Sequence, residues 1–155
     1  MCIRDRYRAT GIVFENNIVY TGAEGLFIYG YVSGSGVTAN YNDYYTTSST
    51  TTFELNGKSY SSFASYQSKT GQDKNSVFAN PDYLTLPTCT STKESGPPTP
   101  ITTCSPTPNL DISTTSPAEN TGNASLGSAD FGTVDFNGNP RVSASGQINM
   151  GAFEQ

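Results

Sequence analysis

The sequence repeats itself near its N-terminal end, where residues 14–20 read FENNIVY and residues 39–45 read ANYNDYY. In this alignment Asn17 corresponds to Asn42 at an offset of 25 residues, and large apolar or aromatic side chains follow both asparagines. Fixed periods of about 20 to 50 residues are typical of solenoid proteins, in which each repeat packs on the next. The repeat therefore predicts that the two segments are consecutive turns of one coil.

A coil of short parallel strands accounts for the residue types in this region. Adjacent parallel strands lie about 4.8 Å apart, so equivalent residues of successive turns stack on one another. Asparagine tolerates the left-handed backbone of a corner, and stacked asparagine amides can hydrogen-bond along the axis. We therefore predict a structural ladder formed by Asn17 and Asn42. The side chains expected to face inward are Ile12, Phe14, Ile18, Leu26, Ile28 and Val37.

The composition favours an all-β fold. The chain has 10 Tyr, 8 Phe, 15 Gly and 9 Pro, and only 14% of its residues are charged. Aromatic residues and threonine separated by glycine, proline and asparagine are typical of short strands joined by turns. A net charge of −5 without a basic stripe excludes a nucleic-acid partner. Without a run of about 18 apolar residues, we expect no membrane span.

Beyond residue 45 the regular pattern ends. Asn56-Gly57 and Asn137-Gly138 are strong hairpin signals. A serine start, Lys69 in the last turn and Gly71 just after it predict a short helix within residues 61–71. Hairpins at the end of a solenoid cover backbone that would otherwise be exposed for aggregation.

These features divide the chain into five parts. Residues 1–6 resemble a translated adapter remnant rather than native sequence, and we exclude them from the fold. We assign residues 7–45 to the last regular coils and 46–88 to an irregular coil with the short helix. Residues 89–104 form a proline-rich loop bounded by cysteines, and 105–155 form a C-terminal capping segment.

Cys89 and Cys104 bracket the proline-rich loop. A disulfide at its neck would stabilise the fold by about 3 kcal/mol in the chain-entropy model, and it would indicate an oxidising compartment. Two free thiols remain the alternative. A metal site is not expected, because the chain has no histidine to complete a zinc ligand set.

Several short motifs occur in a fixed order: residues 40–45, 63–71 with 76–83, 116–122, 135–141 and 150–154. Together they resemble the C-terminal region of bacterial right-handed parallel β-helix proteins of the pectate-lyase-like type, next to the choice-of-anchor Q terminus. The sequence departs from that pattern at Glu119-Asn120 and at Asn149-Met150, and the cysteine-bounded loop looks like an insertion. The resemblance implies a right-handed parallel β-helix, here its last coils, with an irregular cap of hairpins and one short helix.

We find no catalytic constellation. Arg141 could clamp an acidic sugar, but a structural pair with Asp135 or Glu154 is the favoured interpretation. Asp135 begins a turn rather than a calcium loop, because glycine falls at the fourth position and no glutamate follows at the twelfth. We expect no cofactor, although calcium remains open for the parent protein.

Three tyrosines remain as a ligand-binding candidate. Tyr41, Tyr44 and Tyr45 could form an aromatic platform for sugar rings, or they could fill the stack of the coil.

We therefore expect a non-catalytic C-terminal part of a secreted or cell-surface bacterial β-helix protein, a monomer within a longer chain, whose partner is a polysaccharide. One alternative is the end of a polysaccharide lyase or glycoside hydrolase with its catalytic coils upstream. The other is an adhesin or surface stalk.

Overall fold

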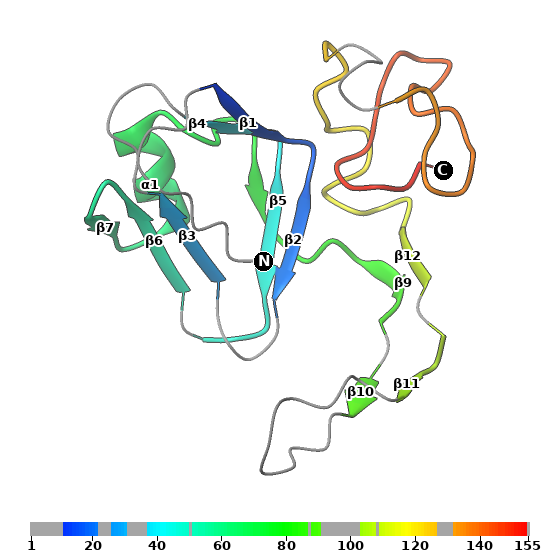
Figure 1. Ribbon diagram of the computed structural model, residues 1–155, viewed down its shortest axis with the longest axis horizontal. Coiled ribbons are helices and arrows are strands. Elements are labelled where there is room, and N and C mark those ends of the chain that lie inside the picture. Colours follow the sequence, from blue (N-terminus) through cyan, green and yellow to red (C-terminus); the bar gives the residue numbers. More distant parts are fainter. Residues whose placement is uncertain are drawn as a thin grey trace.

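The computed structural model describes residues 11–21, 26–30, 37–49, 51–86, 88–90, 103–107, 109–126 and 132–154. Within these ranges the chain forms short strands, turns and one helix (Figure 1). The predicted all-β class is thus confirmed at this level. Residues 1–6, which we predict to be non-native, lie outside the described ranges, as does the tip of the cysteine-bounded loop. No helix in the described ranges has the length and hydropathy needed to cross a membrane.

The elements in chain order are β1 (Ile12–Glu15), β2 (Ile18–Thr21), β3 (Leu26–Gly30), β4 (Val37–Asn40), β5 (Asp43–Thr46), β6 (Thr51–Leu55), β7 (Lys58–Tyr60), α1 (Phe63–Thr70), β8 (Val77–Phe78), β9 (Tyr83–Thr85), β10 (Thr88–Thr90), β11 (Thr103–Ser105) and β12 (Asn109–Ile112). They form sheets of two or three strands each.

The sequence repeat matches the register of three parallel strand pairs. Strand β1 pairs with β4, β2 with β5 and β3 with β6, all in parallel. In the β2–β5 pair Ile18 lies opposite Asp43, so partners are 25 residues apart, and the other two pairs have the same offset. The predicted stacking of Asn17 and Asn42 is confirmed, because the Asn17 Nδ2 donates to the Asn42 Oδ1 at 3.1 Å.

A third level of chain begins regularly and then diverges. Strand β8 continues the β2–β5 sheet in parallel, and the backbone N–H of Asp73 donates to the carbonyl of Ala39. Strand β7, by contrast, folds back antiparallel on β6. The turn between them is the predicted hairpin, with Asn56 and Gly57 at φ values of 54° and 72°.

Helix α1 (Phe63–Thr70) confirms the helix predicted within residues 61–71. The Ser62 hydroxyl accepts a hydrogen bond from the Ser65 N–H at its start. Gly71, at φ 72°, provides the left-handed residue that ends it.

Aromatic residues of α1 fill the interior of the coil. Tyr66 is buried and belongs to a cluster with Tyr44 and Phe53. The ring of Phe63 lies 5.6 Å from the rings of both Tyr44 and Phe53. Helix α1 therefore packs its aromatic side chains against those of β5 and β6.

The C-terminal segment occupies a different place from the cap that we predict for residues 105–155. Its buried residues Ile112, Ala118 and Met150 pack against Ile18 and Val77, which lie in the β2–β5–β8 sheet. Figure 1 shows this segment beside β2, on the side away from α1. The segment thus covers an outer face of the coils.

One predicted orientation is wrong as a result. Ile18 does not face inward: it packs against the C-terminal segment, while its neighbour Val19 packs against the interior cluster. Successive side chains of a strand point to opposite faces, so only one of the two can face inward. Phe14 faces the interior as predicted. The side chains of Leu26, Ile28 and Val37 lie outside the described part.

A buried carboxylate connects the levels of the coil. Asp73 is fully buried, and its Oδ1 accepts hydrogen bonds from the Asn42 Nδ2 (3.2 Å), the Tyr44 hydroxyl (3.1 Å) and the Ser76 hydroxyl (2.6 Å). Its Oδ2 accepts from the Tyr66 hydroxyl at 3.4 Å. Burial raises the pKa of Tyr44 and Tyr66, and the nearby Asp73 raises it further, so both hydroxyl groups keep their protons and donate hydrogen bonds.

The cysteines lie on a projecting hairpin of β10 and β11, in which Cys89 is the direct antiparallel partner of Cys104. Directly opposed residues in antiparallel strands have Cα atoms about 4.5–5.5 Å apart, within the range of about 4.4–6.8 Å that disulfides span. The side chains lie outside the described part, so the disulfide stays a prediction with a compatible backbone.

For the disulfide, we expect non-reducing digestion to yield one linked peptide containing both cysteines, which separates on reduction. Cys89→Ser should lower the free energy of unfolding by about 3 kcal/mol. Mass spectrometry of the alkylated protein checks the linkage, and urea denaturation measures the loss. Complete alkylation of both thiols without a reductant would contradict the prediction.

For the buried network, Asp73→Ala should lower the free energy of unfolding by about 3 kcal/mol, because its buried donors lose their acceptor. The matched control is Asp82→Ala. Asp82 has a similar positive φ of 51°, against 54° for Asp73, but is exposed, so we expect a loss of about 0.5 kcal/mol or less. Urea denaturation measures both, and equal losses would refute the role of the carboxylate.

Candidate functional site

The three tyrosines considered either as a sugar platform or as filling of the stack do not share one exposed face. Tyr44 is 3% exposed and lies in the interior cluster, so its ring is not accessible to a ligand. Tyr41 is half-buried against the C-terminal segment. Tyr45, also half-buried, lies next to Tyr20, with ring centroids 5.3 Å apart. The reason for this correction is again the alternation of the strand, which turns neighbours in β5 to opposite faces.

Arg141 forms the structural pair that the sequence favours. Its Nη1 lies 3.1 Å from the Glu154 Oε1 and donates to the carbonyl oxygen of Gly151. Both charged side chains are 7% exposed. Burial raises the pKa of Glu154 to about 7, although Arg141 opposes the shift.

Asp135 has the predicted turn role. Its carboxylate accepts hydrogen bonds from the backbone N–H groups of Asn139 (2.7 Å) and Glu154 (2.8 Å), and from the Asn139 side chain. Burial acts to raise the pKa of Asp135, but these hydrogen bonds outweigh it and lower the pKa overall. Asp135 therefore ties the closing hairpin to the last residues as a carboxylate.

Asp43 is the second carboxyl group with a raised pKa. It is fully buried, and its Oδ1 accepts a hydrogen bond from the Ala79 N–H at 3.3 Å. Its Oδ2 has no hydrogen-bond partner among the described residues. Burial raises the pKa of Asp43 to about 7, and the negative charge of Asp82 adds to the effect. Asp43 does not line the cleft described next, so we assign it no role in binding.

A cleft with a volume of about 660 Å³ is lined by residues of the N-terminal strands and of the C-terminal segment. The corner around Glu15 and Ile18 and the closing hairpin with Phe136 both contribute to its lining. The complete lining consists of Glu15, Asn16, Asn17, Ile18, Tyr83, Leu110, Ile112, Leu126, Val134, Asp135, Phe136, Arg141, Met150, Gly151, Ala152 and Phe153.

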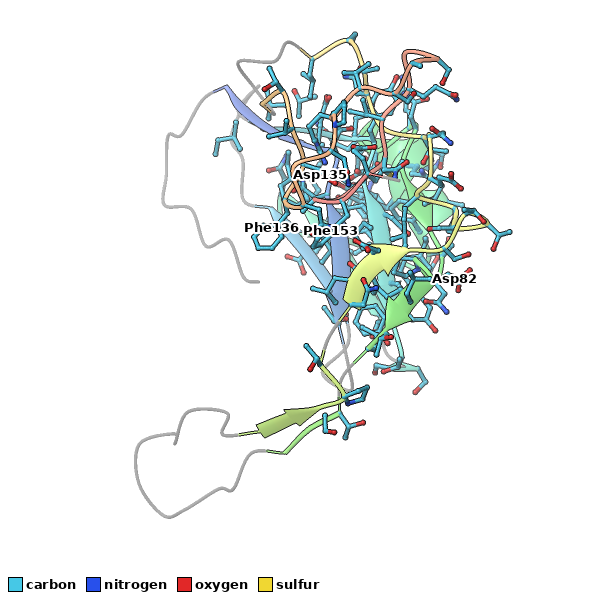
Figure 2. All side chains as sticks on the ribbon, turned by 90° about the vertical axis from the view of Figure 1, so that its right-hand side faces the viewer. Asp82, Asp135, Phe136 and Phe153 are labelled. Carbon is cyan, nitrogen blue, oxygen red and sulfur yellow. The ribbon has the colours of Figure 1, made fainter. Side chains whose placement is uncertain are left out.

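Two phenylalanines form the aromatic part of the cleft. Phe136 is 82% exposed, and its ring meets that of Phe153 edge to face, with centroids 5.5 Å apart. Figure 2 shows the two side chains next to each other and close to Asp135, whereas Asp82 lies away from them. The Phe136 N–H donates to the Ala152 carbonyl, so the backbone that carries the exposed ring is held in place.

The corner of the coil contributes the polar part. Asn16, at φ 58°, exchanges hydrogen bonds with the backbone of Asn123. The side chain of Asn123 in turn donates to the Glu15 Oε2 at 2.7 Å. This brings together residues 107 positions apart, so the coil and the C-terminal segment fix the cleft jointly.

Sequence reasoning missed this cleft because its walls come from several separated stretches. The usable signal was the exposed aromatic residue in the Asp135-Phe136-Asn137-Gly138 turn, since a large apolar side chain in a turn is unusual. Among the described residues, no group of three or more acidic, histidine or cysteine side chains could hold a metal ion.

None of the protein families, curated proteins or solved structures compared with this chain matches it. A function therefore has to be inferred from the geometry together with the sequence resemblance.

The raised pKa of Asp43 predicts a loss of stability as the pH rises. In the unfolded chain this carboxyl loses its proton near its ordinary pKa of 3.8, whereas in the folded protein it keeps the proton to about 7. The folded state thus binds more protons between these values, and the free energy of unfolding falls across this window, by about 2–4 kcal/mol.

Asp43→Asn should flatten this part of the profile, whereas Asp111→Asn, a control on strand β12, should leave it unchanged. Urea unfolding at several pH values from about 4 to 8 measures the slopes. Parallel profiles of Asp43→Asn and the unmodified protein would argue against the buried proton.

Proposed function

We propose that this chain is the end of a right-handed parallel β-helix. It would serve as a non-catalytic C-terminal module of a secreted or cell-surface bacterial protein associated with carbohydrate. The observation that carries the proposal is the shared offset of 25 residues in three separate parallel strand pairs. One offset in three sheets is expected when a chain winds repeatedly around one axis.

The proposed position at the end of the β-helix is supported by strand β7 and helix α1, which follow the second repeat. Strand β7 occupies the edge of β6 in the antiparallel direction, and α1 fills the interior with aromatic side chains. Both features depart from the regular repeat and would oppose the stacking of a further regular coil on β6. On the opposite side, β1, β2 and β3 are edge strands of their sheets among the described residues. Preceding coils would pair with these edges.

The non-catalytic role is supported by the environment of the shifted carboxyl groups. Perturbed pKa values are candidate signs of catalysis, but Glu154 is paired with Arg141 and Asp43 is sealed away from the cleft. Both are accounted for by packing. Carbohydrate association rests on the cleft, which combines an exposed aromatic ring with carboxylate and amide groups.

A tandem duplication of residues 12–36 tests the coil. The duplicated protein should gain one complete turn with the correct register and remain folded, with a urea midpoint at least equal to that of the original chain, since each repeat buries its neighbour's face. Circular dichroism and urea unfolding measure this. The control inserts the same 25 residues in reversed order, which should destabilise the protein. If both insertions behave alike, the β-helix proposal fails.

A further inference from the structure

We propose that the cleft between the coil corner and the closing hairpin binds an uncharged oligosaccharide in preference to an acidic one. This inference rests on the proposed carbohydrate association and specifies its ligand class. The cleft volume of about 660 Å³ falls in the range of small-ligand sites, about 300–1,000 Å³. It would hold a short stretch of a glycan chain.

The aromatic wall provides the stacking surface. Phe136 is 82% exposed, a large apolar area to leave in water, and Phe153 supports its ring edge to face rather than covering it. The face of an aromatic ring carries partial negative charge, so it attracts the polarised C–H groups on the apolar face of a sugar ring. A fixed ring with an open face fits this role.

The coil corner provides acceptors for sugar hydroxyl groups. The Glu15 Oε2 is held by Asn123, and its Oε1 has no hydrogen-bond partner among the described residues. The Asn17 Nδ2 donates to the carbonyl of Glu15 and to Asn42, which fixes the amide while its Oδ1 accepts no bond from a described residue. Hydrogen bonds from hydroxyls to an ionised carboxylate are stronger than neutral ones.

The charges of the lining select against acidic sugars. Glu15 and Asp135 are both acidic, and the lowered pKa of Asp135 keeps it ionised. The cationic residue of the lining is Arg141, whose Nη1 is engaged by Glu154 in the buried pair and by the carbonyl oxygen of Gly151. A uronate would bring a third negative charge into the cleft without a compensating cation, and such repulsion is a common source of specificity.

The test measures binding of neutral hexasaccharides (β-glucan, xylan and mannan types) and of hexagalacturonate to the full chain by titration calorimetry or NMR. We expect saturable binding of at least one neutral oligosaccharide and none of hexagalacturonate. Phe136→Ala should weaken the neutral ligand about tenfold, and Phe136→Trp should retain it. Leu84→Ala removes a side chain that is 56% exposed but outside the cleft, and should have no effect.

Glu15→Gln tests the charge argument. It keeps an acceptor but removes the charge, so binding of the neutral ligand should fall by less than about tenfold, while hexagalacturonate should bind better than before. Absence of any neutral ligand, equal binding of hexagalacturonate to the unmodified protein, or equal effects of Phe136→Ala and Leu84→Ala would overturn the proposal. The coil duplication is independent of these results, so a failed sugar site and a failed β-helix are distinguishable.

Discussion

The structure depends on satisfying one buried asparagine. Asn42 is fully buried, and its amide must find partners because an unpaired buried polar group costs about 1–3 kcal/mol. Its Oδ1 accepts from the backbone and side chain of Asn17 below, and its Nδ2 donates to Asp73 above. Its own N–H donates to Ser76. One side chain therefore joins three levels, and it does so only when the register between turns is correct. The 25-residue spacing is therefore required for the hydrogen bonds between Asn17 and Asn42, and also for the stacking of apolar side chains in the paired strands.

The second constraint is the close contact of the C-terminal segment with the coil. Gly151, at φ 98°, approaches so closely that an added Cβ would lie 2.9 Å from the Cδ1 of Ile18. Its N–H donates to the carbonyl of Asn16. Gly122 is similarly close to Ile148, at 2.7 Å. The segment has little regular secondary structure, so its order depends on these contacts and on the buried Arg141–Glu154 pair. Its position over the outer face of the coil is thereby fixed.

The sequence predicted the features that depend on local or periodic signals. The repeat gave the strand register, and the serine, lysine and glycine around α1 gave its limits. It did not predict the orientation of Ile18, because the corner at Asn16 and Asn17 resets which residues face inward. For Tyr44 it left open a sugar platform or a place in the stack, and the structure buries this side chain. The burial of Asp43 has no local signal in the sequence, because it arises from tertiary packing. The cleft could not be predicted, because contacts between residues more than 100 positions apart leave no periodic trace.

Paired repeats present similar surfaces, so a specific site needs a feature that occurs only once. In the β1–β4 register Glu15 lies opposite Asn40, and the Asn40 side chain accepts the N–H of Asn75 in the next level. Asn40 therefore has a structural role in the second repeat, whereas the equivalent residue of the first repeat, Glu15, carries a carboxylate. The non-repetitive hairpin then adds the exposed Phe136 to the lining of the same cleft. Combining one coil corner with one irregular hairpin gives a single site at a defined level, which the coil by itself would not provide.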